Sequence, residues 1–176
     1  MRLENEHIRL RAPEPEDLEL VYRLENESSE WAVGCTTVPY SRFLLRQYIE
    51  QTTGDIYADK QVRLMIERKS DKQVMGCADL VNYEPMHQRA EVGIIIVPEY
   101  RGKGYGSMSL DVLCHYALDF LHLHQLVAYI AADNIGSLAM FRSQGFVHGK
   151  QLEQWLRNAD GGYKDAWLLQ RIKSDV

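Results

Sequence analysis

A glycine-rich loop is the part of the sequence whose residue types and spacing best suit chemistry. Glycines stand at alternate positions in Arg101-Gly102-Lys103-Gly104-Tyr105-Gly106, between an apolar run and a long amphipathic segment. Glycine has no Cβ, so the backbone can turn tightly and point successive N–H groups inward. A helix that begins at such a loop adds partial positive charge. The loop therefore predicts a site for an anionic group such as a pyrophosphate, with Arg101 and Lys103 adding charge at its rim.

The spacing of the glycines separates this loop from two nucleotide-binding motifs. A P-loop requires lysine after its second glycine, whereas Lys103 precedes that glycine here. A dinucleotide fingerprint requires G-x-G-x-x-G in an early βαβ unit, and this loop reads G-x-G-x-G after several expected antiparallel strands. The plain alternative is a glycine-rich turn with no ligand. The position between a buried strand and a long helix favours a ligand.

The elements that position this loop follow from the hydrophobic periodicity. We expect strands near residues 7–13, 62–66, 74–81, 90–97, 126–132, 146–157 and 163–172, and helices from Pro15, from Ser41, from Gly106 to about Leu121, and at 135–144. Pro98 ends the strand before the loop, because proline cannot donate to a sheet ladder. The resulting order is β-α-α-β-β-β-α-β-α-β-β. It predicts one domain over residues 1–176, of the α/β (α+β) class, with a mixed, mostly antiparallel sheet and helices on both faces.

Composition and charge narrow the classes of function. No apolar run approaches the roughly 18–20 residues that cross a bilayer, and the charged N-terminus is unlike a signal peptide, so we expect a cytoplasmic protein without membrane association. The three cysteines are widely spaced and the six histidines lack metal-site spacing, which predicts no metal. A net charge of −5 argues against a nucleic-acid partner and is compatible with a cationic one.

Two motifs in order resemble one enzyme family. The stretch VPEYRGKGYG is similar to the [QR]-x-x-G-x-[GA] signature of the GNAT acetyltransferases. Downstream, Asn134, Ser137, Phe141 and the pair Gly145-Phe146 resemble the second cofactor segment of that family, N-x-x-[AS]-x-x-x-[YF]-x-x-x-G-F. The element order also matches, so the resemblance covers nearly the whole chain. Within the family, the sequence looks most like bacterial spermidine N-acetyltransferases and ribosomal-protein N-terminal acetyltransferases.

The resemblance implies acetyl-coenzyme A (acetyl-CoA) as cosubstrate and direct transfer of the acetyl group to a primary amine in a ternary complex. The strand before the loop is expected to splay from its neighbour and to offer pantetheine the amides and carbonyls near Ile95 and Val97, one of which stabilises an oxyanion. Asn134 is expected to contact the pantetheine arm or to order the helix that follows. The implied cofactor-binding residues are Ile95, Ile96, Val97, Arg101, Gly102, Lys103, Gly104, Tyr105, Gly106, Asn134, Ser137 and Phe141.

Glu91 is the candidate general base, because an ammonium acceptor must lose a proton before its nitrogen can attack. The alternative is that Glu91 forms an ion pair on the sheet with Arg89, Arg68 or Arg63.

The general acid departs from the family pattern. Many relatives carry a tyrosine seven residues after the asparagine, and Phe141 at that position has no proton to give. Ser137 is a substitute, although it is also a plausible helix-surface residue. Tyr105 and Tyr129 are weaker candidates, and water is another source of the proton.

The resemblance places the acceptor between the first helices and the final hairpin, with Glu30, Tyr40 and Glu84 as candidate binding residues. The acceptor classes are a polyamine or other small amine, or a protein N-terminus. The mostly apolar or neutral residues 31–37 weigh against a polyamine, because spermidine enzymes tend to carry paired acids there. Phe141 keeps open a non-catalytic acyl-CoA-binding module. Related enzymes often pair, so a homo-oligomer is compatible with the sequence.

Overall fold

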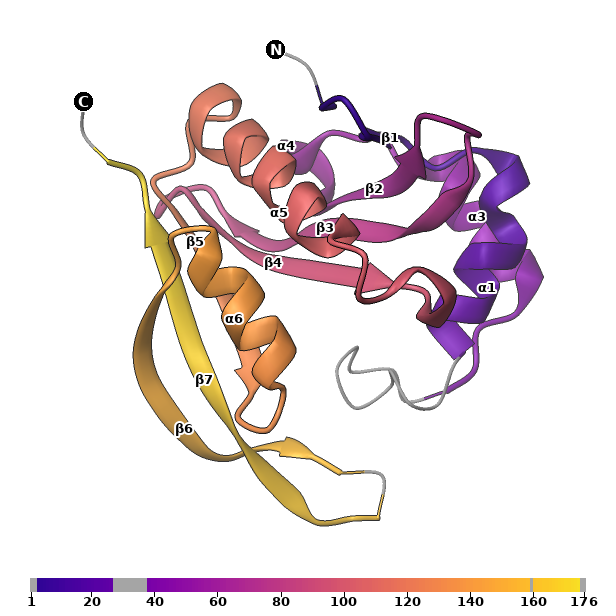
Figure 1. Cartoon of the computed structure of the whole chain (residues 1–176). Coiled ribbons are helices and arrows are strands. Elements are labelled where there is room, and N and C mark those ends of the chain that lie inside the picture. The colour runs from indigo at the N-terminus through magenta and orange to yellow at the C-terminus, as the bar shows by residue number, and fades with distance from the viewer. Residues whose placement is uncertain (1–2, 27–37, 159, 175–176) are drawn as a thin grey trace.

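The strands form one seven-stranded sheet with the order β1-β2-β3-β4-β5-β7-β6 in the computed structural model, which describes residues 3–26, 38–158 and 160–174 (Figure 1). The strands are β1 (Ile8–Arg11), β2 (Val62–Arg68), β3 (Val74–Glu84), β4 (Arg89–Ile96), β5 (Gln125–Ala131), β6 (Val147–Arg157) and β7 (Tyr163–Ile172). Every neighbouring pair is antiparallel except β4 and β5, which are parallel. The expected mixed, mostly antiparallel sheet is confirmed.

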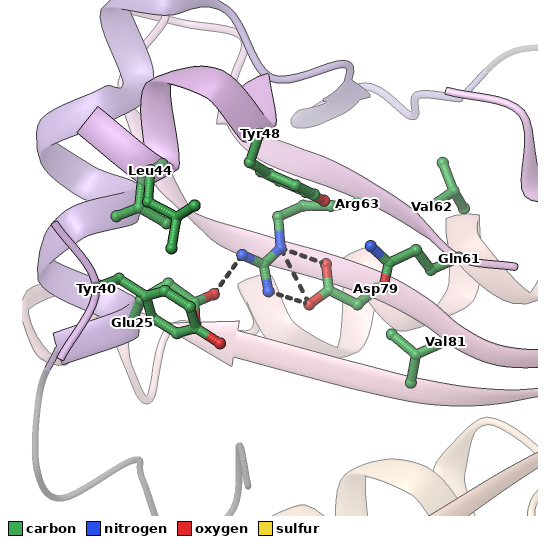
Figure 2. A pocket seen from close by; sticks show the side chains of 10 residues that line it. Glu25, Tyr40, Leu44, Tyr48, Gln61, Val62, Arg63, Asp79 and Val81 are labelled. Atoms are coloured by element: carbon green, nitrogen blue, oxygen red, sulfur yellow. Dashed lines mark hydrogen bonds and ion pairs between the residues drawn. The ribbon is translucent and has the colours of Figure 1, made fainter. Parts of the chain in front are cut away.

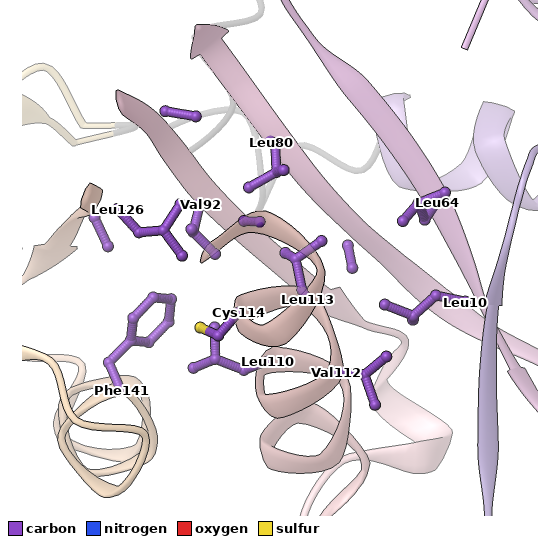
Figure 3. Packing of buried hydrophobic residues seen from close by; sticks show 14 of the residues in the cluster. Leu10, Leu64, Leu80, Val92, Leu110, Val112, Leu113, Cys114, Leu126 and Phe141 are labelled. Atoms are coloured by element: carbon purple, nitrogen blue, oxygen red, sulfur yellow. The ribbon is translucent and has the colours of Figure 1, made fainter. Parts of the chain in front are cut away.

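Helices cover both faces of this sheet, as expected. The helices are α1 (Leu18–Asn26), α3 (Arg42–Gln51), α4 (Ile56–Asp59), α5 (Tyr105–His115) and α6 (Ile135–Ser143). Side chains alternate along β2, so that Leu64 and Ile66 pack with α5 and α6, whereas Met65 packs with α1 and α3. Figure 3 shows the larger cluster, in which Leu110 and Leu113 of α5 point toward the strands.

Local signals in the sequence begin and end several helices where predicted. The Ser41 side chain accepts a hydrogen bond from the Leu44 N–H at 3.1 Å and so caps α3. Gly145 follows α6 with a φ of 78°, a left-handed conformation that favours glycine at a helix end. A 3₁₀ turn at Pro15–Asp17 precedes α1, and another at Pro98–Tyr100 follows β4.

The structure differs from the predicted elements between β3 and β4. The sequence predicts a strand near residues 74–81, whereas β3 continues to Glu84 and Tyr83 is buried. The pairing with β4 shifts register between Val81 and Glu84, and Asn82 has a φ of 52° there. This irregularity lets the strand continue past the polar Asn82. The short helix α4 was also not expected.

The parallel ladder between β4 and β5 is short, and this opens the sheet. Its three residue pairs are Arg89↔Gln125, Ala90↔Leu126 and Glu91↔Val127. Both strands continue, β4 to Ile96 beside β3 and β5 to Ala131 beside β7. Among the described residues, no strand pairs with the edge of β4 beyond Glu91, so the expected splay is present.

Candidate active site

The glycine loop has the conformation that an anion site needs. Gly102 and Gly104 have φ values of 73° and 82°, which a residue with a Cβ adopts only with strain. Gly104 is the N-cap of α5 and has no capping side chain. The N–H groups of the first helical turn therefore lack partners within the helix and are available to a ligand. A Cβ on Gly106 would lie 2.8 Å from Sδ of Met140, so this glycine allows α5 and α6 to approach closely.

The two cationic side chains of the loop hold it against the end of β4. The Arg101 Nε donates a hydrogen bond to the Ile96 carbonyl at 2.7 Å. The Lys103 Nζ donates to the Glu99 carbonyl at 3.0 Å. Both side chains are exposed, so their charge lies at the rim of the loop as predicted.

A third cation near the loop was not assigned to it from the sequence. Arg68, at the end of β2, lies over the rings of Tyr100 and Tyr105, with its guanidinium carbon 5.1 and 6.0 Å from their centroids. Hydrogen bonds to Asp71 and Tyr105 raise the pKa of Arg68 above its ordinary value. Only the fold brings β2 beside the loop, so no local signal in the sequence marks this contact.

The open backbone groups of β4 lie one residue away from the predicted ones. The Val97 N–H donates to the Met75 carbonyl at 2.9 Å, and the Val97 carbonyl accepts from the Tyr100 N–H at 3.0 Å. Backbone groups alternate in direction along a strand, so those of Ile95 also face β3. The expectation of open groups at Ile95 and Val97 is therefore wrong. The groups that face the opening belong to Ile94 and Ile96, and the Ile96 carbonyl already binds Arg101.

The second motif lies on α6 and serves mainly to order that helix. The Asn134 Oδ1 accepts a hydrogen bond from the Ser137 N–H at 3.1 Å, which confirms the alternative in which Asn134 caps the helix. The Phe141 ring is 4% exposed and packs edge-on against Phe146, with 4.9 Å between the ring centroids. Figure 3 shows this ring pointing from α6 into the core. The structure thus gives Phe141 a place in the core, and its contact with the cofactor stays a prediction.

Glu91 lies at the last residue pair before β4 and β5 part. Its Oε2 accepts a hydrogen bond from the Asn82 Nδ2 at 3.0 Å. The three arginines that the sequence offered as partners bind other carboxylates: Arg89 binds Glu84, Arg68 binds Asp71, and Arg63 binds Asp79 and Glu25. In the described part of the chain, the ion-pair alternative for Glu91 is contradicted.

A cavity of about 430 Å³ lies between α1, α3 and the strands β2 and β3 (Figure 2). Arg63 crosses its floor and binds Asp79 through Nε and a terminal nitrogen, at 3.0 and 2.8 Å. It also binds Glu25. Burial opposes the charge of Arg63, but the two carboxylates outweigh it and raise the pKa of Arg63 well above its ordinary value. Among the described residues, two carboxylates face one guanidinium, and this leaves the ion cluster negative.

Tyrosines and leucines complete the lining of this cavity, which we call the α1–α3 cavity. Tyr40 lies in the wall beside Glu25, as the sequence predicted for an acceptor residue. Tyr48 stands over Arg63, and burial raises the pKa of Tyr48. Asp79, Arg63 and Tyr48 were not assigned to the site from the sequence. A charged residue inside an apolar strand, as in both β2 and β3, was the signal that could have found the first two.

A second cavity of about 350 Å³, the β4–β5 cavity, lies where these strands part. Glu91 and Glu84 both line it, together with Arg89 and Tyr129. Glu84 binds Arg89 through both carboxylate oxygens, at 2.9 and 3.0 Å. The predicted acceptor residues are thus divided between two cavities, because Tyr40 lines the other one. The candidate Glu30 falls outside the described residues.

The residues placed by the structure bring together no group of three or more His, Cys, Asp or Glu side chains that could hold a metal. None of the described helices is long and apolar enough to cross a membrane.

Known proteins match this chain over nearly its whole length. Residues 7–147 match the model of the acetyltransferase (GNAT) domain. The spermidine N(1)-acetyltransferase of Vibrio cholerae is 27% identical over 171 residues, covering 97% of this chain and 95% of the relative. That of Escherichia coli is 30% identical over 164 residues, covering 90% and 82%. A putative ribosomal N-acetyltransferase of Bacillus subtilis is 28% identical over 147 residues, covering 81% and 79%.

Solved structures agree with these sequence matches. The Vibrio cholerae spermidine N-acetyltransferase in complex with CoA and spermine has a TM-score of 0.84 at 25% identity, over 96% of this chain and 97% of that one. A dodecameric structure of the same enzyme has a TM-score of 0.80 at 26% identity, over 97% and 96% of the two chains. The chain therefore belongs to the GNAT acetyltransferase family and is an acetyl-CoA-dependent N-acetyltransferase.

Proposed function

We propose that this enzyme acetylates a polyamine, or a small amine of similar charge, held in the α1–α3 cavity. The observation that carries the proposal is the excess of carboxylates over cations around Arg63, in a cavity beside the strand that bears Glu91. A polyamine presents several spaced ammonium groups, and carboxylates are their natural partners. The similarity to two spermidine N(1)-acetyltransferases supports this choice.

The strand register connects the α1–α3 cavity with the opening between β4 and β5. Asp79 pairs with Gly93 and Val81 pairs with Glu91 across β3 and β4. A Cβ on Gly93 would lie 3.7 Å from the Cβ of Asp79, so the missing side chain leaves room beside the carboxylate. One amine of a bound polyamine can therefore extend past Gly93 toward the opening while another stays near Asp79 and Glu25.

The glycine loop fits the pyrophosphate of acetyl-CoA. In this proposal the N–H groups of the first turn of α5 bind the phosphates, and Gly102 and Gly104 supply the left-handed turns that bring the backbone close. The open groups of Ile94 and Ile96 bind the pantetheine arm. When bound, acetyl-CoA supplies a thioester carbon for the amine to attack. An N–H group at the edge of β4 stabilises the negative charge that develops on the carbonyl oxygen.

Glu91 is proposed as the base that takes the proton of the acceptor, through water. The carboxylate has a hydrogen bond from the neutral Asn82 and lies in the second cavity, where water can reach it. A base with a neutral neighbour keeps its charge available for a proton.

The experiment is an acceptor panel, with release of the CoA thiol as the readout. The panel contains spermidine, spermine, monoamines, amino acids, aminoglycosides and peptides with a free N-terminus. We expect spermidine or spermine to have the highest kcat/KM. A preference for peptides would contradict this and support the protein N-terminal alternative, which the Bacillus subtilis relative favours.

A variant of Asp79 tests the site itself. Asp79→Asn removes one charged partner and should raise the KM for spermidine roughly tenfold or more, with the KM for acetyl-CoA unchanged. Glu50→Gln makes the same chemical change on the exposed side of α3 and is the matched control. If the KM for spermidine were equal in Asp79→Asn and the wild type, the α1–α3 cavity would not be the acceptor site. Thermal unfolding of both variants reports whether the fold survives.

We also infer that the chain assembles with copies of itself, which the dodecameric relative supports. Light scattering of the purified protein tests this, and a monomer at micromolar concentration would contradict it.

A further inference from the structure

Acetyl transfer leaves a thiolate that must gain a proton, and this inference rests on the proposed function. Phe141 carries no acidic proton and lies in the core. Ser137 lines neither cavity, and an aliphatic hydroxyl is a weaker acid than a phenol, whose pKa is about 10. The Tyr105 hydroxyl accepts a hydrogen bond from Arg68 at 3.4 Å, at the outer side of the glycine loop. Any side-chain donor must therefore be another residue, with water as the alternative source of the proton.

Tyr129 is the first side chain on its face of β5 beyond the point where β4 and β5 part. The last pair of the ladder is Glu91↔Val127, and these partners share a face of the sheet. Side chains alternate along a strand, so Tyr129 lies on this same face. It is the face away from α5 and α6, because Ala90 and Leu126, the preceding pair, are buried beneath those helices.

The opening leaves space for a reacting group beside Tyr129. A parallel ladder continued by two residues would set Tyr129 opposite Gly93, which has no side chain to fill the gap. Tyr129 and Glu91 both line the β4–β5 cavity of about 350 Å³. A water molecule occupies about 30 Å³ of liquid, so this cavity has room for a chain of waters between the carboxylate and the phenol.

The ring of Tyr129 is held in place from β6, while its hydroxyl is not engaged. Trp155 stacks on the ring with 5.8 Å between centroids and 23° between planes. No hydrogen bond joins the Tyr129 hydroxyl to another residue that the structure describes, and the side chain is only partly buried. A fixed ring with a free hydroxyl suits a proton donor.

We propose that Tyr129 is the general acid of this enzyme. The amine nitrogen forms a bond to the thioester carbon, the carbon–sulfur bond breaks, and its electron pair goes to sulfur. Sulfur takes the proton of the Tyr129 hydroxyl, while Glu91 takes a proton from the nitrogen through water. Water in the β4–β5 cavity returns that proton from Glu91 to the Tyr129 oxygen. The acceptor enters this step as the neutral amine, after its ammonium form has released one proton to solvent, so the cycle is balanced and no further reactant is needed.

The first test is Tyr129→Phe, which keeps the ring and its stacking on Trp155 and removes only the hydroxyl. We expect kcat to fall about 100-fold, with little change in the KM for acetyl-CoA. Tyr57→Phe removes a hydroxyl from an exposed tyrosine of α4 and is the matched control, with unchanged kcat. A Tyr129→Phe enzyme within twofold of the wild-type kcat would overturn the assignment and leave the acetyltransferase function standing.

The second test does not depend on turnover or on the identity of the acceptor. Calorimetry compares the affinities of CoA and desulfo-CoA, which lacks the sulfur that the phenol is proposed to meet. The wild type should prefer CoA, and Tyr129→Phe should lose that preference while Tyr57→Phe keeps it. An equal preference in wild type and Tyr129→Phe would overturn the role of Tyr129. Absence of turnover with every acceptor would instead refute the proposed function.

Discussion

Gly76 of β3 should be among the residues least tolerant of a single added carbon. A Cβ built on Gly76 would lie 1.9 Å from the carbonyl oxygen of Ile95 and 3.1 Å from the Cα of Ile96, both on β4. Close carbon–oxygen contacts in sheets are about 3.3 Å, so Gly76→Ala must push the two strands apart by roughly 1.4 Å. The obstacle is backbone rather than a flexible side chain, and it cannot move aside alone.

The cost of this change follows from the displacement it forces. Overpacking of a well-filled interior costs about 1–3 kcal/mol, and a backbone obstacle places Gly76→Ala near 3 kcal/mol. For a chain of this length, that lowers the Tm by about 6–12 °C. The displaced segment also carries the open groups of Ile94 and Ile96, so the affinity for CoA should fall as well.

Thermal unfolding and calorimetry of CoA binding measure the two effects. Gly136→Ala is the control, because its added Cβ meets only the Asn134 Oδ1, at 4.0 Å, on an exposed turn of α6. Alanine is a better helix former than glycine, so this control should keep or slightly raise the Tm. A Tm for Gly76→Ala within 2 °C of the wild type, with unchanged CoA affinity, would refute the close approach of β3 and β4.

Two other predictions concern the anion loop and the ion pairs at β1. Gly104→Asp places a carboxylate beside the proposed pyrophosphate and should abolish CoA binding in calorimetry. Gly104→Ala shares the backbone strain at a φ of 82° without the charge, so it should still bind CoA weakly. Equal CoA affinities of the two variants would exclude the charge effect. Burial alone would raise the pKa of Glu67, but hydrogen bonds from Arg11 and Arg9 outweigh it and lower that pKa. The stability from Glu67 is thus present above about pH 4.3 and is lost as the pH falls through the lowered pKa. Glu67→Gln should lower the free energy of unfolding by about 3 kcal/mol at neutral pH. Below neutral pH, the free energy of unfolding, measured with denaturant, should fall less steeply for the variant than for the wild type. Parallel curves of this free energy against pH would contradict the prediction.

Residues whose role depends on local patterns were predictable. The glycine spacing at 102–106 and the buried stripe of α5 follow from neighbours a few residues away, so the loop and its helix were correctly expected. Ser41 and Gly145 mark helix ends by their own side-chain and backbone properties. The seven strands and their order along the chain followed from periodicity in the same way.

Residues whose role depends on register were not predictable. Backbone groups alternate in direction along β4, so an error of one residue reverses which groups face β3. The sequence therefore predicted open groups at Ile95 and Val97, whereas the structure has them at Ile94 and Ile96. The pairing of Arg63 with Asp79 needs the β2–β3 register, which pairs these two residues directly. Tyr40 and Glu84 fall in separate cavities for the same reason, since only the assembled sheet fixes its faces.

Arg63 pairs with the carboxylates of the α1–α3 cavity before any acceptor binds. With no acceptor bound, Asp79 and Glu25 share one tethered counterion, which offsets only part of their negative charge. An incoming cation gains little by adding a single charge, because it must share carboxylates that are already engaged. A molecule with two or more ammonium groups can use the shared cluster and another carboxylate, such as Glu91, at once. In the proposed acceptor site, the tethered guanidinium therefore favours molecules with two or more ammonium groups over sodium, potassium and simple monoamines.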